Sequence, residues 1–303
     1  MSSEKYRDQV RLLLQVMNCF GGTTDFALKG GTAINLFLRE DFPRLSVDID
    51  LIYLHGERFD EAKVAINEVL DGFEPAIRQI AGFRQYSRTK PDGFTRLITT
   101  LAARVKIEVS PIVRGSVYQP SIRAVSDAVA DEFGYAEMLV GSIDDVYAGK
   151  LVAAMDRQHP RDLFDVRNLL DNEGITPSMI KAFAVYLCSS NAAMSEVLTP
   201  RRKELAQVYE AQFEGMVNPD SGVTLDVLIR TREEMIDLIH GMLGDAERAF
   251  IMSVQRKDPD WALLGIPGLN DLPSVRFKVQ NLGKMPEQKY EEETRLLEST
   301  LYP

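Results

Sequence analysis

The segment that most restricts the fold is residues 28–53, which reads LKGGTAINLFLREDFPRLSVDIDLIY. Its last part alternates apolar residues with Asp48 and Asp50. Because the side chains of a β-strand point alternately to its two faces, the two carboxylates share one face and the apolar residues share the other. The pattern therefore predicts a strand that packs one face into the core and offers the opposite face as a platform for a hard cation.

A glycine step precedes this strand. Gly30 and Gly31 allow the backbone to turn tightly and approach a ligand closely, and Thr32 opens an apolar run at 33–38 with a helical pattern. Such a step directs backbone N–H groups and the positive end of a helix at whatever lies above the carboxylates. A D-x-D strand or a glycine turn alone is often structural, but together they favour a nucleoside triphosphate with its magnesium ion.

A second acidic strand is predicted at 104–110, RVKIEVS. Alternation places its valines and isoleucine on one face and Arg104, Lys106 and Glu108 on the other. If this strand lies beside the D-x-D strand, Glu108 becomes a third carboxylate, and three carboxylates can hold two magnesium ions. The alternative is a solvated Glu108 paired with Arg104 or Lys106.

The other elements of the first half follow from periodicity and turn residues. We predict a tight turn at 90–93, whose Lys-Pro-Asp-Gly sequence favours reversal of the chain. The remaining predictions are amphipathic helices at 4–20 and 59–70 and strands at 26–28, 82–89 and 94–100.

Beyond Gly134 the pattern becomes mainly helical. A helix that starts near Ser142 carries Lys150, and a turn at His159 leads to a helix in which Arg161 and Asp165 are four residues apart. On structural grounds alone, Arg161 and Asp165 form a surface ion pair and Lys150 extends from its helix to solvent.

Charge is distributed unevenly. The net charge of -10 argues against a general nucleic-acid-binding surface. Residues 76–125 nevertheless contain nine basic and two acidic residues, a local balance of +7 that suits a polyanionic substrate. The basic residues of this zone are Arg78, Arg84, Arg88, Lys90, Arg96, Arg104, Lys106, Arg114 and Arg123.

Several classes of protein are disfavoured. Cys19 and Cys188 are far apart, and the three histidines show no zinc-binding spacing, so neither a disulfide framework nor a zinc site is expected. The polar start of the chain and the absence of a long uncharged run predict a soluble, cytoplasmic protein without a membrane span. A length of 303 residues suits one large domain or two moderate ones.

Several motifs together resemble the AbiEii/AbiGii toxin family of bacterial nucleotidyltransferases. The resemblance rests on KGGTAINLF, on RLSVDIDL, on K-x-E-V at 106–109, on Lys150 with R-D-x-x-D at 161–165, and on the tail LPSVRFKVQNLGKM. The fifteen residues between Thr32 and Asp48 are more than is usual in the wider superfamily. The resemblance implies an α/β (α+β) fold, with a mixed-sheet nucleotidyltransferase domain like that of DNA polymerase β at 1–135 and a mainly helical domain at 136–303.

The resemblance also assigns roles to individual residues. Three carboxylates would hold magnesium, three basic residues and the glycine step would meet the triphosphate, and Asp165 would orient Lys150 or the nucleotide. The implied metal ligands are Asp48, Asp50 and Glu108, and the implied nucleotide contacts are Lys29, Gly31, Thr32, Lys150 and Arg161.

The implied function is that of a toxin of a bacterial toxin–antitoxin or abortive-infection system. It would move a nucleoside monophosphate from an NTP to a hydroxyl, with the 3′ acceptor end of tRNA as the expected acceptor and a cognate antitoxin as the expected partner. Two alternatives stay open: transfer to a protein or small molecule, and an NTP-binding interaction module without turnover. In a third, structural alternative, the acids only line a polar sheet face.

Overall fold

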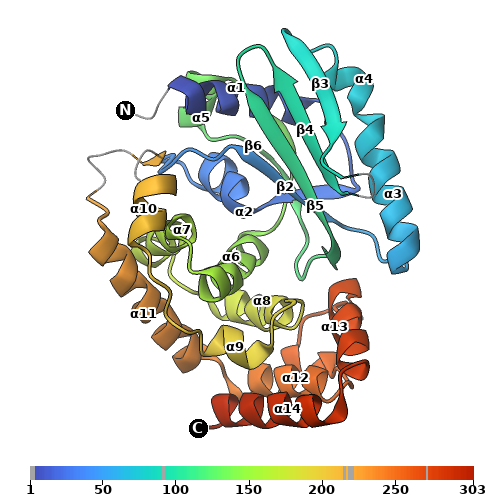
Figure 1. The fold of residues 1–303 in the computed structure, drawn as a ribbon, viewed down its shortest axis with the longest axis vertical. Helices are drawn as coiled ribbons and strands as arrows, with labels where there is room; N and C mark the ends of the chain where they lie inside the picture. The colour runs from blue at the N-terminus through green and yellow to red at the C-terminus, as the bar shows by residue number, and fades with distance from the viewer. Residues whose placement is uncertain (1–3, 91–92, 214–215, 218–221, 271) are drawn as a thin grey trace. The chain divides into compact units, whose positions relative to one another are not determined.

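The computed structural model describes residues 4–90, 93–213, 216–217, 222–270 and 272–303 (Figure 1). The chain divides into two compact units. The first comprises Met1–Val146 with Gln212–Gly222, and the second comprises Tyr147–Ala211 with Val223–Pro303. The fold is mixed α/β, as predicted.

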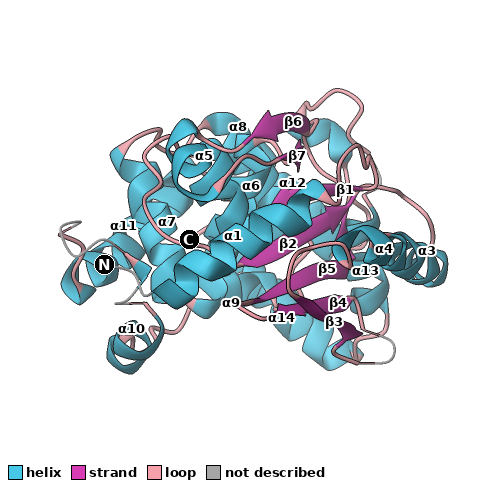
Figure 2. Ribbon diagram, turned by 90° about the horizontal axis from the view of Figure 1, so that it is seen from above, coloured by secondary structure: helices cyan, strands magenta, loops and turns pink. Residues whose placement is uncertain are grey.

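The described residues of the first unit contain seven strands in one mixed sheet. They are β1 Phe26–Lys29, β2 Asp48–Tyr53, β3 Phe83–Arg88, β4 Thr95–Thr100, β5 Arg104–Arg114, β6 Ser121–Ala124 and β7 Glu137–Val140. Their order is β3-β4-β5-β2-β1-β7-β6 (Figure 2). The pairs β2–β5 and β1–β7 are parallel and the other neighbours are antiparallel.

The alternation predicted for the two acidic strands is confirmed by burial. Ile49 and Leu51 of β2 are fully buried, whereas Asp48 and Asp50 between them are partly exposed. In β5, Val105 and Ile107 are buried and the charged residues between them are not. Burial of the apolar face against helices therefore fixes the register that leaves the acids on the other face.

Helices of the first unit cover the sheet. They are α1 Glu4–Asn18, α2 Gly30–Thr32, α3 Phe59–Gly72, α4 Glu74–Ile77 and α5 Asp127–Phe133. α1 contacts β5 and β7, and α3 contacts β5 (Figure 2). Their apolar faces are buried, as the predicted amphipathic helices require.

One local element differs from its prediction, and another prediction falls partly on residues that the structure does not describe. The apolar run Ala33–Leu38 forms a π-helix, η1, in which the Arg39 N–H donates to the Ile34 carbonyl at 3.0 Å. Asn35 Nδ2 donates to the Gly31 carbonyl at 2.8 Å, so a side chain takes an acceptor of the preceding turn. In the predicted turn at 90–93, residues 91 and 92 lie outside the described residues.

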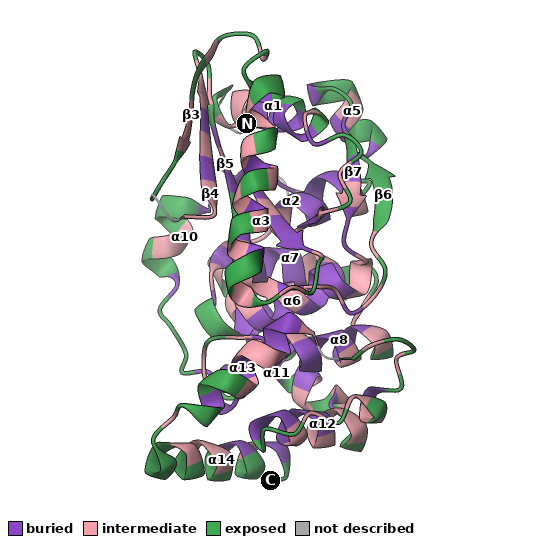
Figure 3. Ribbon diagram, turned by 90° about the vertical axis from the view of Figure 1, so that its right-hand side faces the viewer, coloured by how far each residue is buried: buried purple, intermediate pink, exposed green. Residues whose placement is uncertain are grey.

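The second unit is helical, as predicted. α6 Ile143–Arg157 begins in the first unit, and it is followed by α7 Pro160–Asp171, α8 Pro177–Leu187, α9 Met194–Leu198, α10 Ala206–Gln212, α11 Leu225–Met242, α12 Asp245–Gln255, η4 Trp261–Leu264, α13 Pro273–Gly283 and α14 Glu287–Leu301. α12 contacts α8, α13 and α14, and Figure 3 shows the buried sides of these helices. Trp261 packs on Phe250 with ring centroids 5.1 Å apart, as expected for a core residue. No helix in the described part of the chain is long and apolar enough to cross a bilayer.

Candidate active site

A row of charged side chains crosses the middle of the sheet. Lys29 of β1 pairs in register with Asp50 of β2, and Asp50 pairs with Glu108 of β5. Residues directly opposite each other on neighbouring strands share a face, with Cβ atoms about 4.5–5.5 Å apart in antiparallel pairs. The pairing of β2 with β5 therefore places Glu108 beside the D-x-D pair, which is the condition on which its predicted role depends.

Lys106 lies among the three carboxylates. It pairs in register with Asp48, and its Nζ is 2.8 Å from Glu108 Oε2. Burial lowers the pKa of Lys106, but the hydrogen bond to Glu108 and the negative charges of Asp48 and Asp50 outweigh this and raise the pKa above its ordinary value. The alternative interpretation of Glu108 was an ion pair with Arg104 or Lys106. The pair with Lys106 is present, and it lies on the same face as the carboxylates.

Lys29 occupies the other end of the row. Burial lowers the pKa of its ammonium, and the charges of Asp50 and Glu108 oppose this effect without cancelling it. These two charges act on Lys29 because the three residues are neighbours across β1, β2 and β5. The face thus carries a lysine on each side of the acids.

The glycine step lies against the acidic strand. Gly30 has a φ of 72°, and a Cβ there would be 2.8 Å from Asp50 Oδ2. A Cβ on Gly31 would be 2.6 Å from Arg44 Nη2 and 3.2 Å from Ser46 Oγ. Both glycines therefore lie close to side chains of the acidic strand and of the segment that precedes it, and the close approach to a ligand stays a prediction.

Thr32 has a structural contact that its predicted role did not include. Its side chain is 1% exposed, and its Oγ1 lies 2.5 Å from the Asp48 carbonyl oxygen and 2.8 Å from Ser46 Oγ. Because a carbonyl can only accept, the Thr32 hydroxyl donates to Asp48. Thr32 therefore fixes the start of the helical segment to the strand that carries the acids.

The chemistry of these donors fits a divalent cation. Asp48, Asp50 and Glu108 offer carboxylate oxygens, which are the ligands that Mg²⁺ prefers. Lys106 is the cation that these carboxylates face in the structure, which shows that the site favours positive charge. Among the described residues, however, no three His, Cys, Asp or Glu side chains are arranged as a metal site.

A second charged cluster lies within the helical unit. Lys150 Nζ is 2.8 Å from Asp162 Oδ1 and 2.9 Å from Asp165 Oδ2, and the three side chains are at most 5% exposed. Arg157 Nε adds a contact of 2.5 Å to Asp162 Oδ2. Burial alone would raise the pKa of Asp162, but Lys150 and Arg157 outweigh burial and hold that pKa well below its usual range.

This cluster corrects the structural interpretation of the R-D-x-x-D motif. Asp165 pairs with Lys150, not with Arg161. Lys150 is buried and doubly paired, so it does not extend to solvent. In the described part of the chain, the Arg161 side chain has no ion-pair partner, and His159 caps α7 by accepting from the Arg161 backbone N–H at 3.1 Å.

Two residues near the acidic strand were missed. Arg44 is 4% exposed, its Nη1 donates to the Leu45 carbonyl at 3.0 Å, and its Nη2 lies against Gly31. Ser46 is 7% exposed and contacts Thr32. The signal was the alternation of the acidic strand, which continues upstream: Ser46 is two residues before Asp48, and Arg44 is four residues before it.

The predicted basic zone is smaller than its composition suggests. Arg96 is fully buried and bonds to Asp71 and Asn67, Arg88 also pairs with Asp71, and Arg78 pairs with Glu74. The acids that neutralise the zone lie just upstream of it. Among the described residues, four of its exposed cations have no ion-pair partner: Arg84, Lys90, Arg104 and Arg123.

Register separates the remaining cations by face. Thr95 of β4 is paired with Glu108, so its neighbour Arg96 points to the opposite face, on which α3 packs. Arg104 alternates with Lys106 and Glu108 and shares their face. Arg104 is therefore an exposed cation of the zone on the carboxylate face, and Lys106 lies closer to the acids.

Comparison with known proteins agrees with this geometry. The family described as "Nucleotidyl transferase AbiEii toxin, Type IV TA system" matches residues 11–280. Among solved structures, MenT4, a nucleotidyltransferase toxin from Mycobacterium tuberculosis H37Rv, has a TM-score of 0.57 at 14% identity over 98% of this chain and 94% of its own. JHP933 from Helicobacter pylori has a TM-score of 0.48 at 18% identity over 80% and 95%. No curated protein matches the sequence. The fold is that of a nucleotidyltransferase toxin, and the chain belongs to the AbiEii nucleotidyltransferase toxin family of type IV toxin–antitoxin systems.

Proposed function

We propose that this protein transfers a nucleoside monophosphate from an NTP to an acceptor hydroxyl in a magnesium-dependent reaction that releases pyrophosphate. The observation that carries the proposal is the row of Lys29, Asp50 and Glu108, with Asp48 beside it on the same face. Nucleotidyl transfer requires positioning and charge neutralisation more than a nucleophilic side chain. Rigid strands that hold charges of both signs at one place supply both requirements.

The three carboxylates would have different roles in the reaction. Asp48 and Asp50 would hold magnesium, and Glu108 would complete the ligand set once it parts from Lys106. When bound, magnesium neutralises the triphosphate and favours deprotonation of the acceptor hydroxyl. Glu108 would accept that proton while the acceptor oxygen bonds to the α-phosphorus and the bond from the α-phosphorus to the bridging oxygen of the pyrophosphate breaks.

Basic groups would bind the triphosphate. Lys29 is the ammonium next to Asp50. The backbone at Gly31 lies against Arg44 and Ser46, just upstream of the acidic strand, and Thr32 donates to the Asp48 carbonyl. In line with the family resemblance, Lys150 and Arg161 would provide further contacts. Asp165, together with Asp162, would act as a positioning residue that keeps the Lys150 ammonium charged and fixed in direction.

The acceptor that we propose is the 3′ end of tRNA. Arg104 supports it, because an exposed cation on the carboxylate face can bind a phosphate of the acceptor strand without reading its sequence. Membership of a type IV toxin–antitoxin family implies an antitoxin partner.

The test is transfer of label from each of four α-labelled NTPs to total bacterial tRNA with magnesium. The tRNA is used intact or after periodate oxidation of its terminal ribose. One NTP should label intact tRNA and not oxidised tRNA. Label on protein or a small molecule instead would refute the tRNA acceptor and keep the transferase. Magnesium-dependent NTP binding without label on any acceptor would favour the interaction module.

A further inference from the structure

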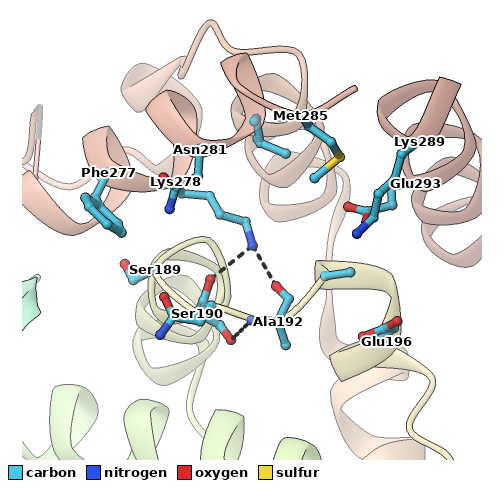
Figure 4. A pocket seen from close by; sticks show the side chains of 13 residues that line it. Ser189, Ser190, Ala192, Glu196, Phe277, Lys278, Asn281, Met285, Lys289 and Glu293 are labelled. Carbon is cyan, nitrogen blue, oxygen red and sulfur yellow. Dashed lines mark hydrogen bonds and ion pairs between the residues drawn. The ribbon is translucent and has the colours of Figure 1, made fainter. Parts of the chain in front are cut away.

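A cavity in the helical unit lies outside the residues of the proposed reaction. Its volume is about 270 Å³, and it is enclosed by the segment from Ser189 to Glu196, by α13 and by α14. Figure 4 shows Lys278 extending from α13 to the chain at Ser190 and Ala192. The cavity is therefore formed by three parts of one unit, with an ammonium at their junction.

Lys278 is a buried cation with incomplete partners. Its side chain is 8% exposed, and its Nζ donates to the carbonyls of Ser190 at 3.0 Å and Ala192 at 2.6 Å. An ammonium has three N–H donors, so one is not used by these carbonyls. In the part of the chain that the structure describes, no carboxylate lies within ion-pair distance of this Nζ.

Such a group is electrostatically unusual. A buried charge is costly unless a counter-charge or hydrogen bonds compensate for it, and two neutral carbonyls supply only part of the compensation. Burial accordingly lowers the pKa of Lys278, and the nearby charges of Glu293 and Glu196 oppose that effect only in part. An anion in the cavity would provide the missing counter-charge and accept the third N–H.

The lining restricts which anion fits. Glu196, Glu293 and Lys289 line the same cavity, and Lys289 pairs with Glu293 at 3.6 Å (Figure 4). Glu196 is then the acid that this pair does not balance, so a phosphate with a charge near −2 would be repelled more than a monovalent carboxylate. Neutral donors are available: the Ser190 hydroxyl accepts from the Ala192 N–H at 3.2 Å, which leaves its own hydrogen to donate, and Asn281 contributes an amide. Met285 and Phe277 offer contact to an apolar substituent.

We propose that this cavity binds one carboxylate group, held by the third N–H of Lys278 and by the Ser190 hydroxyl. The same chemistry is found in a small free acid and at the carboxyl end of a peptide chain. The volume of about 270 Å³ admits either one, but no large ligand. The site is independent of the proposed transfer reaction because none of its residues takes part in that reaction.

The test is thermal unfolding of the full chain at constant ionic strength. The probes are sodium acetate, N-acetylglycylglycine with a free carboxyl end, the same peptide amidated, and inorganic phosphate. We expect a saturable rise in Tm with acetate or the free-acid peptide and none with the amide. Saturation with the peptide acid alone would identify a chain end, and equal saturation with acetate a free small acid. A response to phosphate only, or no response to any carboxylate, would overturn the proposal.

Variants separate binding from folding. Lys278→Met should weaken carboxylate binding about tenfold or more, the effect of a lost charged hydrogen bond. Lys284→Met, an exposed lysine at the end of α13 that does not line the cavity, should bind as the wild type does. If Lys278→Met does not fold, Asn281→Ala, an exposed lining residue, should weaken binding roughly threefold. Unchanged binding by whichever of these lining variants folds would contradict the site.

Discussion

Lys106 and Glu108 show how single side chains set the state of the sheet face. The ammonium of Lys106 bonds to Glu108 and faces Asp48 and Asp50, so it competes with any metal ion for the same carboxylates. The side chains of Lys106 and Glu108 are 39% and 49% exposed, so this competition takes place where both groups are partly shielded from solvent. In the proposed site, Lys106 would therefore govern how readily the face accepts a metal ion.

We expect Lys106→Met to bind divalent metal more tightly in the absence of nucleotide, because Glu108 is then free to act as a ligand. The dissociation constant for Mn²⁺, measured by electron paramagnetic resonance, should fall about threefold or more. Arg104→Met removes a positive charge from the same face without removing an ion pair and should change it less. Weaker or unchanged binding by Lys106→Met would mean that Glu108 is not a ligand.

The Lys150 cluster makes stability depend on pH. The pKa of Asp162 is lower in the folded protein than in the unfolded chain, so the unfolded chain takes up the proton first. The stability that Asp162 contributes is complete above its unfolded pKa of about 3.9 and is lost as the pH falls towards the lower folded value. Asp162→Asn should therefore be less stable at neutral pH.

The measurement is the urea unfolding midpoint between pH 6 and pH 3. The wild type should lose more stability across this range than Asp162→Asn, whose side chain has no proton to gain. Asp171→Asn removes an exposed partner of Arg167 and should keep the slope of the wild type. A parallel decline in the wild type and Asp162→Asn would exclude Asp162 as the cause.

Among the strands and helices, the glycine step and the acidic strand are held together by direct contacts and form one structural unit. Gly30 combines a left-handed backbone with a Cβ position 2.8 Å from the Asp50 carboxylate. Thr32 then ties the helical segment to the Asp48 carbonyl. The π-helix that follows is the type of irregularity that often accompanies a functional site.

Gly30→Ala tests whether the close contact between the glycine step and Asp50 matters. The left-handed backbone should cost about 1–2 kcal/mol of stability, and the added Cβ should displace Asp50 and reduce label transfer. Gly22→Ala is the matched control: its φ is 81°, and nothing lies within 4 Å of its Cβ position. It should lose similar stability and keep its activity. Equal activity of the two variants at a temperature where both are folded would argue against a role for the contact with Asp50.

The local elements could be predicted because their signals repeat over two to four residues. The D-x-D alternation, the glycine step and the helix at 59–70 are patterns of neighbours in sequence. The contacts of Arg96 with Asp71 and of Arg44 with Gly31 join residues far apart in sequence. No periodicity encodes such pairs, so the basic zone was overestimated. The alternation does extend upstream to Arg44, but it does not show that Arg44 contacts Gly31.

For the chain as a whole, the question is how an acidic protein would bind the proposed tRNA acceptor. The net charge of -10 opposes binding of RNA at a distance, and four of the nine basic residues of the basic zone are ion-paired within the chain: Arg78, Arg88, Arg96 and Lys106. Binding must then depend on few cations near the carboxylate face, and the register selects Arg104. A weak dependence of affinity on salt follows, because few phosphates are neutralised.

Arg104→Gln should lower tRNA affinity and reduce the slope of log affinity against log salt by about 1. Arg123→Gln is the control. Arg123 is also exposed, and it shares the face of Ser121, which the register across β7 and β1 aligns with Leu51, on the side of the sheet opposite to Asp50. Filter binding at several salt concentrations measures both variants. An equal loss for the two would mean that tRNA binds without regard to face.

The most direct measurement of the central claim is the rate of label transfer by Asp50→Asn. Asparagine keeps the size of the side chain and removes its charge, so the rate should fall about 100-fold or more while the Tm changes little. Asp60→Asn, an exposed acid in the first turn of α3, should transfer label as the wild type does. If Asp50→Asn transfers label at the wild-type rate, the carboxylate row is not the site of the reaction.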